Sequence, residues 1–121
     1  MVVEDDHLIR EAIAEALDEE GFEVVEAANG REALDKLHQQ RASLVLLDLM
    51  MPVMDGWQFR EAQLHDPELS DIPVVVLSAV SPTESQLAAL APAAAFHKPI
   101  DADALLASIE ALTTRDRPTA S

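Results

Sequence analysis

Polar side chains that can bind a metal ion or a phosphate group follow the apolar segments of this sequence. They are Glu4, Asp5 and Asp6 after residues 1–3, Asp48 after residues 44–47, Ser78 after residues 74–77, and Lys98 after residues 94–97. If these segments are parallel strands, their carboxyl ends meet at one edge of the sheet. Carboxylates held that close repel one another, and one lysine cannot neutralise them all. A divalent cation bound by these oxygens would offset the repulsion. A ligand set of a few carboxylates together with water and phosphate oxygens is typical of Mg²⁺.

Asp48 distinguishes this pattern from an ordinary acidic surface. The acids at positions 4–6, taken alone, fit a solvated helix start, where negative charge is favourable. Asp48 instead ends the apolar run LVLL, where a carboxylate without a partner is costly. A carboxylate beside a cation and a lysine can accept a phosphoryl group, because positioning and charge neutralisation supply most of that catalysis. The pattern predicts attack by Asp48, with Lys98 on the phosphoryl oxygens and Ser78 donating a hydrogen bond.

The segments that must position these side chains alternate between strand-like and helix-like patterns. The runs LVLL and VVVL are typical of strands buried on both faces, and therefore of a parallel sheet. We expect strands at residues 1–3, 22–27, 44–47, 74–77 and 94–97, and helices at residues 7–20, 30–40, 55–65 and 82–91. A last helix follows Asp101 and carries Leu105, Ile109 and Leu112 on one face. A strand–helix unit repeated in this way predicts a parallel sheet with helices on both faces and right-handed crossovers.

Capping residues support several of these helix ends. Gly21 is placed to end the first helix in a left-handed conformation. Asn29, with Glu32 three residues on, and Asp101 are expected to cap two later helices. The string Ser81-Pro82-Thr83-Glu84 predicts a capping box with Ser81 as N-cap and proline at the first helical position.

Composition restricts the class of protein further. The 121 residues contain 8 Lys plus Arg against 23 Asp plus Glu, a formal net charge of −15. Such a charge argues against binding to nucleic acid or to anionic membranes. Cysteine is absent, which excludes disulfides and thiolate chemistry, and no apolar run approaches the ~20 residues of a membrane span. The expectation is a single cytoplasmic domain without a signal peptide, since MVVEDD turns acidic after three residues.

The motifs together resemble the receiver domains of two-component response regulators, the CheY-like family. The resemblance runs from Val2 to about Leu112 and is carried by VVEDD, LVLLDLMMPVMDGW, VVVLSA and HKPI. The string from Asp48 through Gly56 is the most specific of these. The resemblance implies a flavodoxin-like, doubly wound α/β fold with a five-stranded parallel sheet of order 2-1-3-4-5 and five helices. It places a receiver domain at residues 1–114, followed by a polar tail at residues 115–121.

The resemblance also implies a role for each site residue. Asp48 is then the phosphoacceptor; Asp5, Asp48 and the backbone carbonyl of Met50 bind Mg²⁺, and Glu4 helps through water. Ser78 and Lys98 contact the phosphoryl group, and Pro99 follows Lys98 through a cis peptide bond. The implied donor is a phosphohistidine on a sensor histidine kinase or a phosphotransfer protein. The chain would signal to a downstream protein through a conformational shift, as a monomer or weak dimer, and would not be an enzyme acting on an external substrate.

Three positions, Ala95, Met50 and Val80, depart from the family pattern. Ala95 stands where relatives usually carry an aromatic residue, and Phe96 fills that role only if one residue is deleted nearby. Met50 and Val80 stand where relatives tune hydrolysis of the acyl phosphate. Because both side chains are apolar, neither can orient an attacking water, and we predict slow autodephosphorylation.

Three alternatives remain open at this point. An aspartyl-phosphate phosphatase of the dehalogenase type uses the same chemistry but needs an acid or similar residue at the position of Met50. A degenerate receiver would act by binding alone. A flavin carrier shares the architecture, but the acidic string EDDH would repel the phosphate of FMN.

Overall fold

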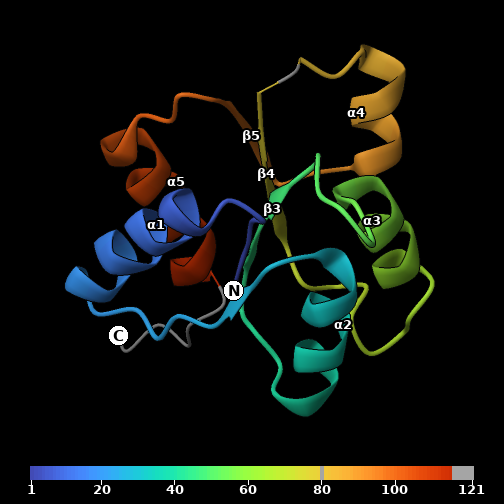
Figure 1. Ribbon diagram of the computed structural model, residues 1–121, viewed down its shortest axis with the longest axis horizontal. Helices are drawn as coiled ribbons and strands as arrows, with labels where there is room; N and C mark the ends of the chain where they lie inside the picture. Colours follow the sequence, from blue (N-terminus) through green and yellow to red (C-terminus); the bar gives the residue numbers. More distant parts are fainter. Residues whose placement is uncertain (80, 116–121) are drawn as a thin grey trace.

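A computed structural model describes residues 1–79 and 81–115, which form a five-stranded parallel sheet covered by helices on both faces (Figure 1). The strands are β1 (Val2–Val3), β2 (Glu26–Ala27), β3 (Val45–Asp48), β4 (Val74–Ser78) and β5 (Ala94–His97). The helices are α1 (His7–Glu19), α2 (Gly30–Gln39), α3 (Gly56–Leu64), α4 (Glu84–Leu90) and α5 (Ala102–Arg115). The strand order is β2-β1-β3-β4-β5, and every pairing is parallel. The predicted fold class and strand order are confirmed.

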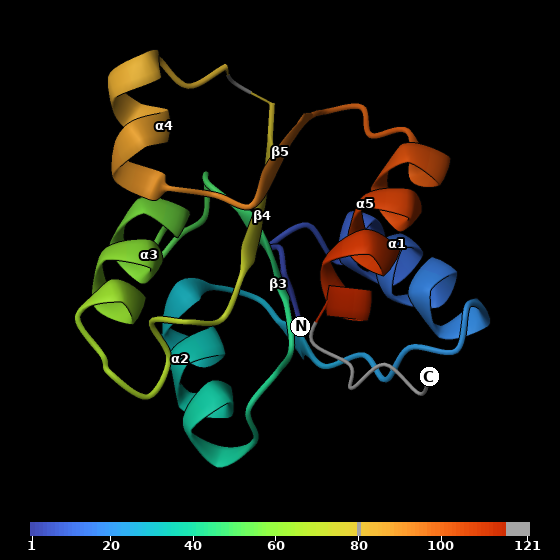
Figure 2. The ribbon, with the colours of Figure 1, turned by 180° about the vertical axis from the view of Figure 1, so that it is seen from behind.

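The apolar strands divide the core into two layers. α1 and α5 cover one face of the sheet, and α2, α3 and α4 lie on the other (Figures 1 and 2). Successive residues of β3 alternate between them: Leu46 packs with the layer that includes Leu105 and Ile109, and Leu47 with the layer that includes Phe59. Burial of each such side chain contributes about 1.5–3 kcal/mol, so the central strands are fixed in register by both layers.

Most predicted helix ends are confirmed. Gly21 has a φ of +90°, the left-handed region that glycine adopts most readily. The side chain of Asn29 accepts a hydrogen bond from the backbone N–H of Glu32 at 2.9 Å. Asp101 accepts from the N–H groups of Asp103 and Ala104. The caps at Asn29 and Asp101 hold helix starts that follow the carboxyl ends of β2 and β5.

Two predicted boundaries are wrong. The second strand, expected over residues 22–27, is limited to Glu26–Ala27, because its neighbour β1 offers only two residues to pair with. α4 begins at Glu84 rather than directly after Ser81. Thr83 is its N-cap: the hydroxyl of Thr83 accepts from the N–H of Gln86 at 3.2 Å, and the side chain of Gln86 accepts from the N–H of Thr83 at 2.9 Å. This reciprocal pair satisfies two backbone donors and places Pro82 ahead of the helix.

A buried polar pair joins α3 to the end of α4. Arg60 is 6% exposed, and its guanidinium donates to the carbonyls of Leu90 at 2.7 Å and Ala91 at 2.9 Å and to the side chain of Gln63 at 2.7 Å. The amide of Gln63 donates in turn to the carbonyls of Leu69 and Ile72. Burial lowers the pKa of Arg60. These bonds satisfy carbonyls at the end of α4, where Ala91 has a φ of +44°.

Within the described residues, no helix is both long enough and apolar enough to cross a membrane. The predicted polar tail falls largely on residues 116–121, which lie outside the described part of the chain. The boundary between a domain at residues 1–114 and that tail stays a prediction.

Candidate functional site

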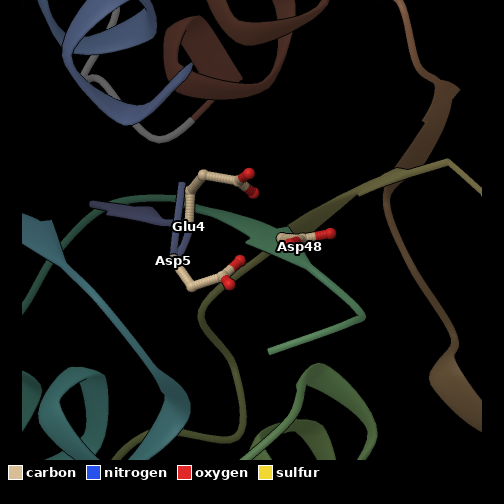
Figure 3. Close-up of side chains that lie close together, drawn as sticks. All are labelled: Glu4, Asp5 and Asp48. Carbon is tan, nitrogen blue, oxygen red and sulfur yellow. The ribbon is translucent and has the colours of Figure 1, made fainter. Parts of the chain in front are cut away.

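Three carboxylates meet at the carboxyl ends of β1 and β3 (Figure 3). Glu4 and Asp5 directly follow β1, and Asp48 is the last residue of β3. One carboxylate oxygen from each residue lies within 4.8 Å of those of the other two. Glu4 is 1% exposed and Asp48 4%, whereas Asp5 is exposed. The cluster is therefore buried on the side of the sheet and open to solvent at Asp5, an arrangement suited to a cation that keeps part of its water shell.

Lys98 supplies a positive charge to this cluster from the end of β5. Its Nζ lies 2.9 Å from Oε1 and 3.1 Å from Oε2 of Glu4, and 3.4 Å from Oδ1 of Asp48. The backbone N–H of Lys98 donates to the carbonyl of Ser78 at 2.8 Å, which continues the pairing of β4 with β5. The Lys98–Pro99 peptide bond is cis, as the resemblance implied.

The cluster shifts the ionisation of its own members. Burial, together with the neighbouring Asp48 and against the opposing effect of Lys98, raises the pKa of Glu4 to about 7. Burial of Lys98 opposes its charge, but Glu4 and Asp48 outweigh burial and raise the pKa of Lys98. The site therefore holds more negative charge than one ammonium compensates, and a bound cation would relieve the remainder.

The other predicted site residues lie on the same edge of the sheet. Ser78 is buried at the end of β4, next to β3 and beside His97 of β5. Met50 is exposed in the loop after β3, and its backbone N–H lies 3.5 Å from Oδ1 of Asp48. The structure brings Glu4, Asp5, Asp48 and Lys98 into direct proximity. The roles of all these residues stay predictions.

The loop after Asp48 is folded by a close approach between backbones. A Cβ atom on Gly56 would lie 2.5 Å from the carbonyl oxygen of Asp48 and 2.7 Å from Cα of Leu49. The N–H of Gly56 donates to the carbonyl of Leu49 at 3.0 Å, and Asp55 caps α3 in a reciprocal pair with Gln58. The start of α3 is thereby packed directly against the backbone of the acceptor residue.

Phe96 does not take the aromatic role that Ala95 leaves empty. Its side chain packs with Leu77 and Val75 in the core layer beneath α1 and α5. Because successive strand residues point to opposite faces, Ala95 belongs to the face of the sheet on which α4 lies, where it is exposed. Phe96 is partly buried against the core, and the position facing α4 carries only a methyl group.

Sequence reasoning missed the contacts of two arginines, Arg10 beside the site and Arg60 between α3 and the end of α4. Arg10 lies on α1, and its guanidinium donates to the backbone carbonyl of Glu4 at 2.8 Å. Arg60 was not singled out. Helical spacing gives no signal for either contact, since the partners lie on other elements.

Comparisons with known proteins identify the family. The family model described as the response regulator receiver domain matches residues 1–110, so the chain belongs to that family. The response regulator MprA of Mycolicibacterium vanbaalenii is 37% identical over 120 residues, which cover 98% of this chain and 51% of that protein. The response regulator RR06 of Streptococcus pneumoniae is 39% identical over 119 residues, or 95% of this chain and 52% of that protein. The chain thus spans about half the length of these relatives.

Solved structures agree in fold. The chemotaxis protein CheY4 of Vibrio cholerae matches with a TM-score of 0.84 and 29% identity, covering 92% of this chain and 94% of that one. The receiver domain of the Francisella response regulator 1452 matches with a TM-score of 0.85 and 28% identity, covering 96% of each chain. Receiver domains are in general signalling domains that bind Mg²⁺ at an acidic pocket, and the donor set of Glu4, Asp5 and Asp48 fits that chemistry.

Proposed function

We propose that this chain is a phospho-accepting receiver domain in which Asp48 takes a phosphoryl group in a Mg²⁺-dependent reaction. The observation that carries the proposal is the position of Asp48. It is buried at the end of β3, within 4.8 Å of the Glu4 and Asp5 carboxylates and 3.4 Å from the Lys98 ammonium. The family match and the relatives named as response regulators support the same conclusion.

Asp5, Asp48 and the backbone carbonyl of Met50 would hold the cation, with Glu4 acting through water. The bound ion supplies charge neutralisation for the phosphoryl oxygens. An oxygen of Asp48 attacks the phosphorus of a phosphohistidine, a P–O bond forms, and the P–N bond breaks. The histidine nitrogen leaves with the electron pair and takes up a proton. The product is an acyl phosphate on Asp48.

Lys98 and Ser78 would hold the transferred group. In the structure Lys98 is shared between Glu4 and Asp48, so it is already positioned beside the acceptor oxygen. Ser78 ends the neighbouring strand and would donate its hydroxyl to a phosphoryl oxygen. The donor would be a sensor histidine kinase or a phosphotransfer protein, and the output would reach a downstream protein. We place the chain in the cytoplasm as a monomer or weak dimer.

Intact mass spectrometry after incubation with acetyl phosphate tests the proposal. We expect a single phosphoryl adduct on the wild-type protein with Mg²⁺, and none with a chelator. Asp48→Asn should abolish the adduct, whereas Asp35→Asn, which changes an exposed acid on α2, should retain it. A folded wild-type protein that takes no adduct would contradict the proposal and favour a receiver that acts by binding alone.

A further inference from the structure

The peptide bond between Glu4 and Asp5 belongs neither to the sheet nor to a helix. On one side, the N–H of Glu4 donates to the carbonyl of Ala27 at 3.0 Å, next to the end of β1. On the other side, Asp6 caps α1 by accepting from the N–H groups of Leu8 and Ile9 at 3.0 and 3.2 Å. The Glu4–Asp5 turn between these anchors carries two of the three clustered carboxylates.

Arg10 anchors this turn from the first turn of α1. Its Nη1 donates to the carbonyl oxygen of Glu4 at 2.8 Å, and its Nε donates at 3.2 Å to Oε1 of Glu26, the β2 residue that pairs with Val2 of β1. The Arg10 side chain is only 16% exposed. Because the guanidinium is planar and its donors are fixed in direction, two bonds to two elements set its orientation as well as its position.

We propose that Arg10 is a positioning residue for the acidic cluster: it holds the Glu4–Asp5 turn so that both carboxylates face Asp48, and it thereby raises the affinity for Mg²⁺. This rests on the proposed Mg²⁺-dependent function. Arg10 acts through the backbone of Glu4 and through Glu26, and the hydrogen bonds of its guanidinium to Glu4, Glu26 and His7 use none of the clustered carboxylate oxygens. Residues that orient metal ligands in this way commonly change metal affinity about tenfold or more when replaced.

The positioning role and the charge of Arg10 have opposite effects on Mg²⁺ binding. A guanidinium near a cation site repels the cation, so removal of the charge alone would tighten binding. Loss of the anchor would weaken binding, since Glu4 and Asp5 would no longer be held toward Asp48. The sign of the change in affinity therefore decides between the two effects.

Calorimetric titration with Mg²⁺ at fixed ionic strength measures that sign. We expect Arg10→Gln to bind Mg²⁺ about tenfold more weakly than the wild type. Arg10→Lys keeps the charge but lacks the planar guanidinium, and we expect it also to bind Mg²⁺ more weakly than the wild type. Arg41→Gln removes the same charge from a residue bound to Glu68 and Asp71, away from the cluster, and should leave affinity nearly unchanged.

Tighter or unchanged binding by Arg10→Gln would overturn the proposal. If Arg10→Gln binds Mg²⁺ more weakly but Arg10→Lys binds it as the wild type does, the planar guanidinium is not required, and that part of the proposal is overturned. If the wild type itself does not bind Mg²⁺, the proposed Mg²⁺-dependent function is contradicted, and the role of Arg10 that rests on it is contradicted as well. Amide NMR without metal tests the anchor even if the variant is less stable. In Arg10→Gln the backbone amide signals of Asp5 and Asp6 should shift and broaden, whereas that of Asp71 should stay in place. Unaltered signals of Asp5 and Asp6 would contradict the anchor.

Discussion

Ionisation of Glu4 should govern how the stability of the metal-free protein depends on pH. The perturbation that isolates this effect is Glu4→Gln, which keeps the shape of the side chain and removes its charge. Burial raises the pKa of Glu4 to about 7 from an ordinary 4.5. When folding raises the pKa of a carboxyl group, the group binds its proton more tightly in the native protein than in the unfolded chain.

The sign and the magnitude follow from these two values. Below the unfolded pKa of 4.5 the carboxyl is neutral in both states, and the folded protein carries no penalty. As pH rises from 4.5 through 7, the unfolded chain ionises first, and stability is lost. The difference between about 7 and 4.5 corresponds to a loss of about 3 kcal/mol once ionisation is complete. The side chain is 1% exposed, so solvent screening reduces this figure little.

Urea unfolding followed by the fluorescence of Trp57 measures the effect. Titrations would run in chelator at several pH values between about 4 and 8. We expect the free energy of unfolding of the wild type to fall by about 3 kcal/mol relative to Glu4→Gln across this range. Other groups with shifted pKa values, such as His38 beside Asp66, occur in both proteins and cancel in the difference. Saturating Mg²⁺ should reduce the difference, because a bound cation favours the ionised carboxylate.

Parallel pH profiles for the wild type and Glu4→Gln would refute the reasoning. That result would mean that Lys98 compensates the Glu4 carboxylate fully, so that burial imposes no cost on its ionisation. A wild type that gains stability as pH rises, relative to the variant, would reverse the sign and would mean that the pKa of Glu4 is lowered in the folded protein.

Three further predictions follow from other features. Gly56→Ala should lower the free energy of unfolding by about 1–3 kcal/mol in urea titrations, because its Cβ would meet the backbone of Asp48; an unchanged midpoint would contradict the close approach. Arg60→Met should lower the free energy of unfolding by about 1–3 kcal/mol in calorimetry, because the carbonyls of Leu90 and Ala91 lose their donor. A more stable variant would show that the cost of burying the Arg60 charge is larger than the gain from these bonds. The phosphorylated protein should hydrolyse slowly with Mg²⁺ and no phosphatase, because Met50 and Val80 carry no polar group; a half-life of seconds would contradict this.

The candidate site could be predicted because its residues end elements that the sequence marks clearly. Asp48 and Ser78 end apolar runs buried on both faces, and parallel pairing forces such ends to one edge of the sheet. The exposure of Asp5 and the contact of Lys98 with Glu4 could not be predicted, since both depend on side-chain directions in the folded protein.

Arg10 and Arg60 show why the rest was missed. A charged residue within a helical pattern is normally assigned to solvent, and spacing alone gives no reason to place it elsewhere. The acceptors of Arg60 are carbonyls of residues 30 and 31 positions away, and carbonyls carry no sequence signal. The start of α4 was misplaced for a related reason: Ser81 fits an N-cap in the sequence, and only the folded chain shows that Thr83 and Gln86 form the capping pair.

The buried contact between Arg60 and the end of α4 restricts the ways in which that helix can move. Arg60 of α3 donates to the carbonyls of Leu90 and Ala91 and thereby holds one end of α4 against α3. The other end begins at the exposed residues Thr83 and Glu84 and connects toward Ser78. A helix that is held at one end can rotate about that end but cannot translate along its axis. Any displacement of α4 that preserves these bonds is therefore a rotation about Leu90, largest at the end that leads back to the site.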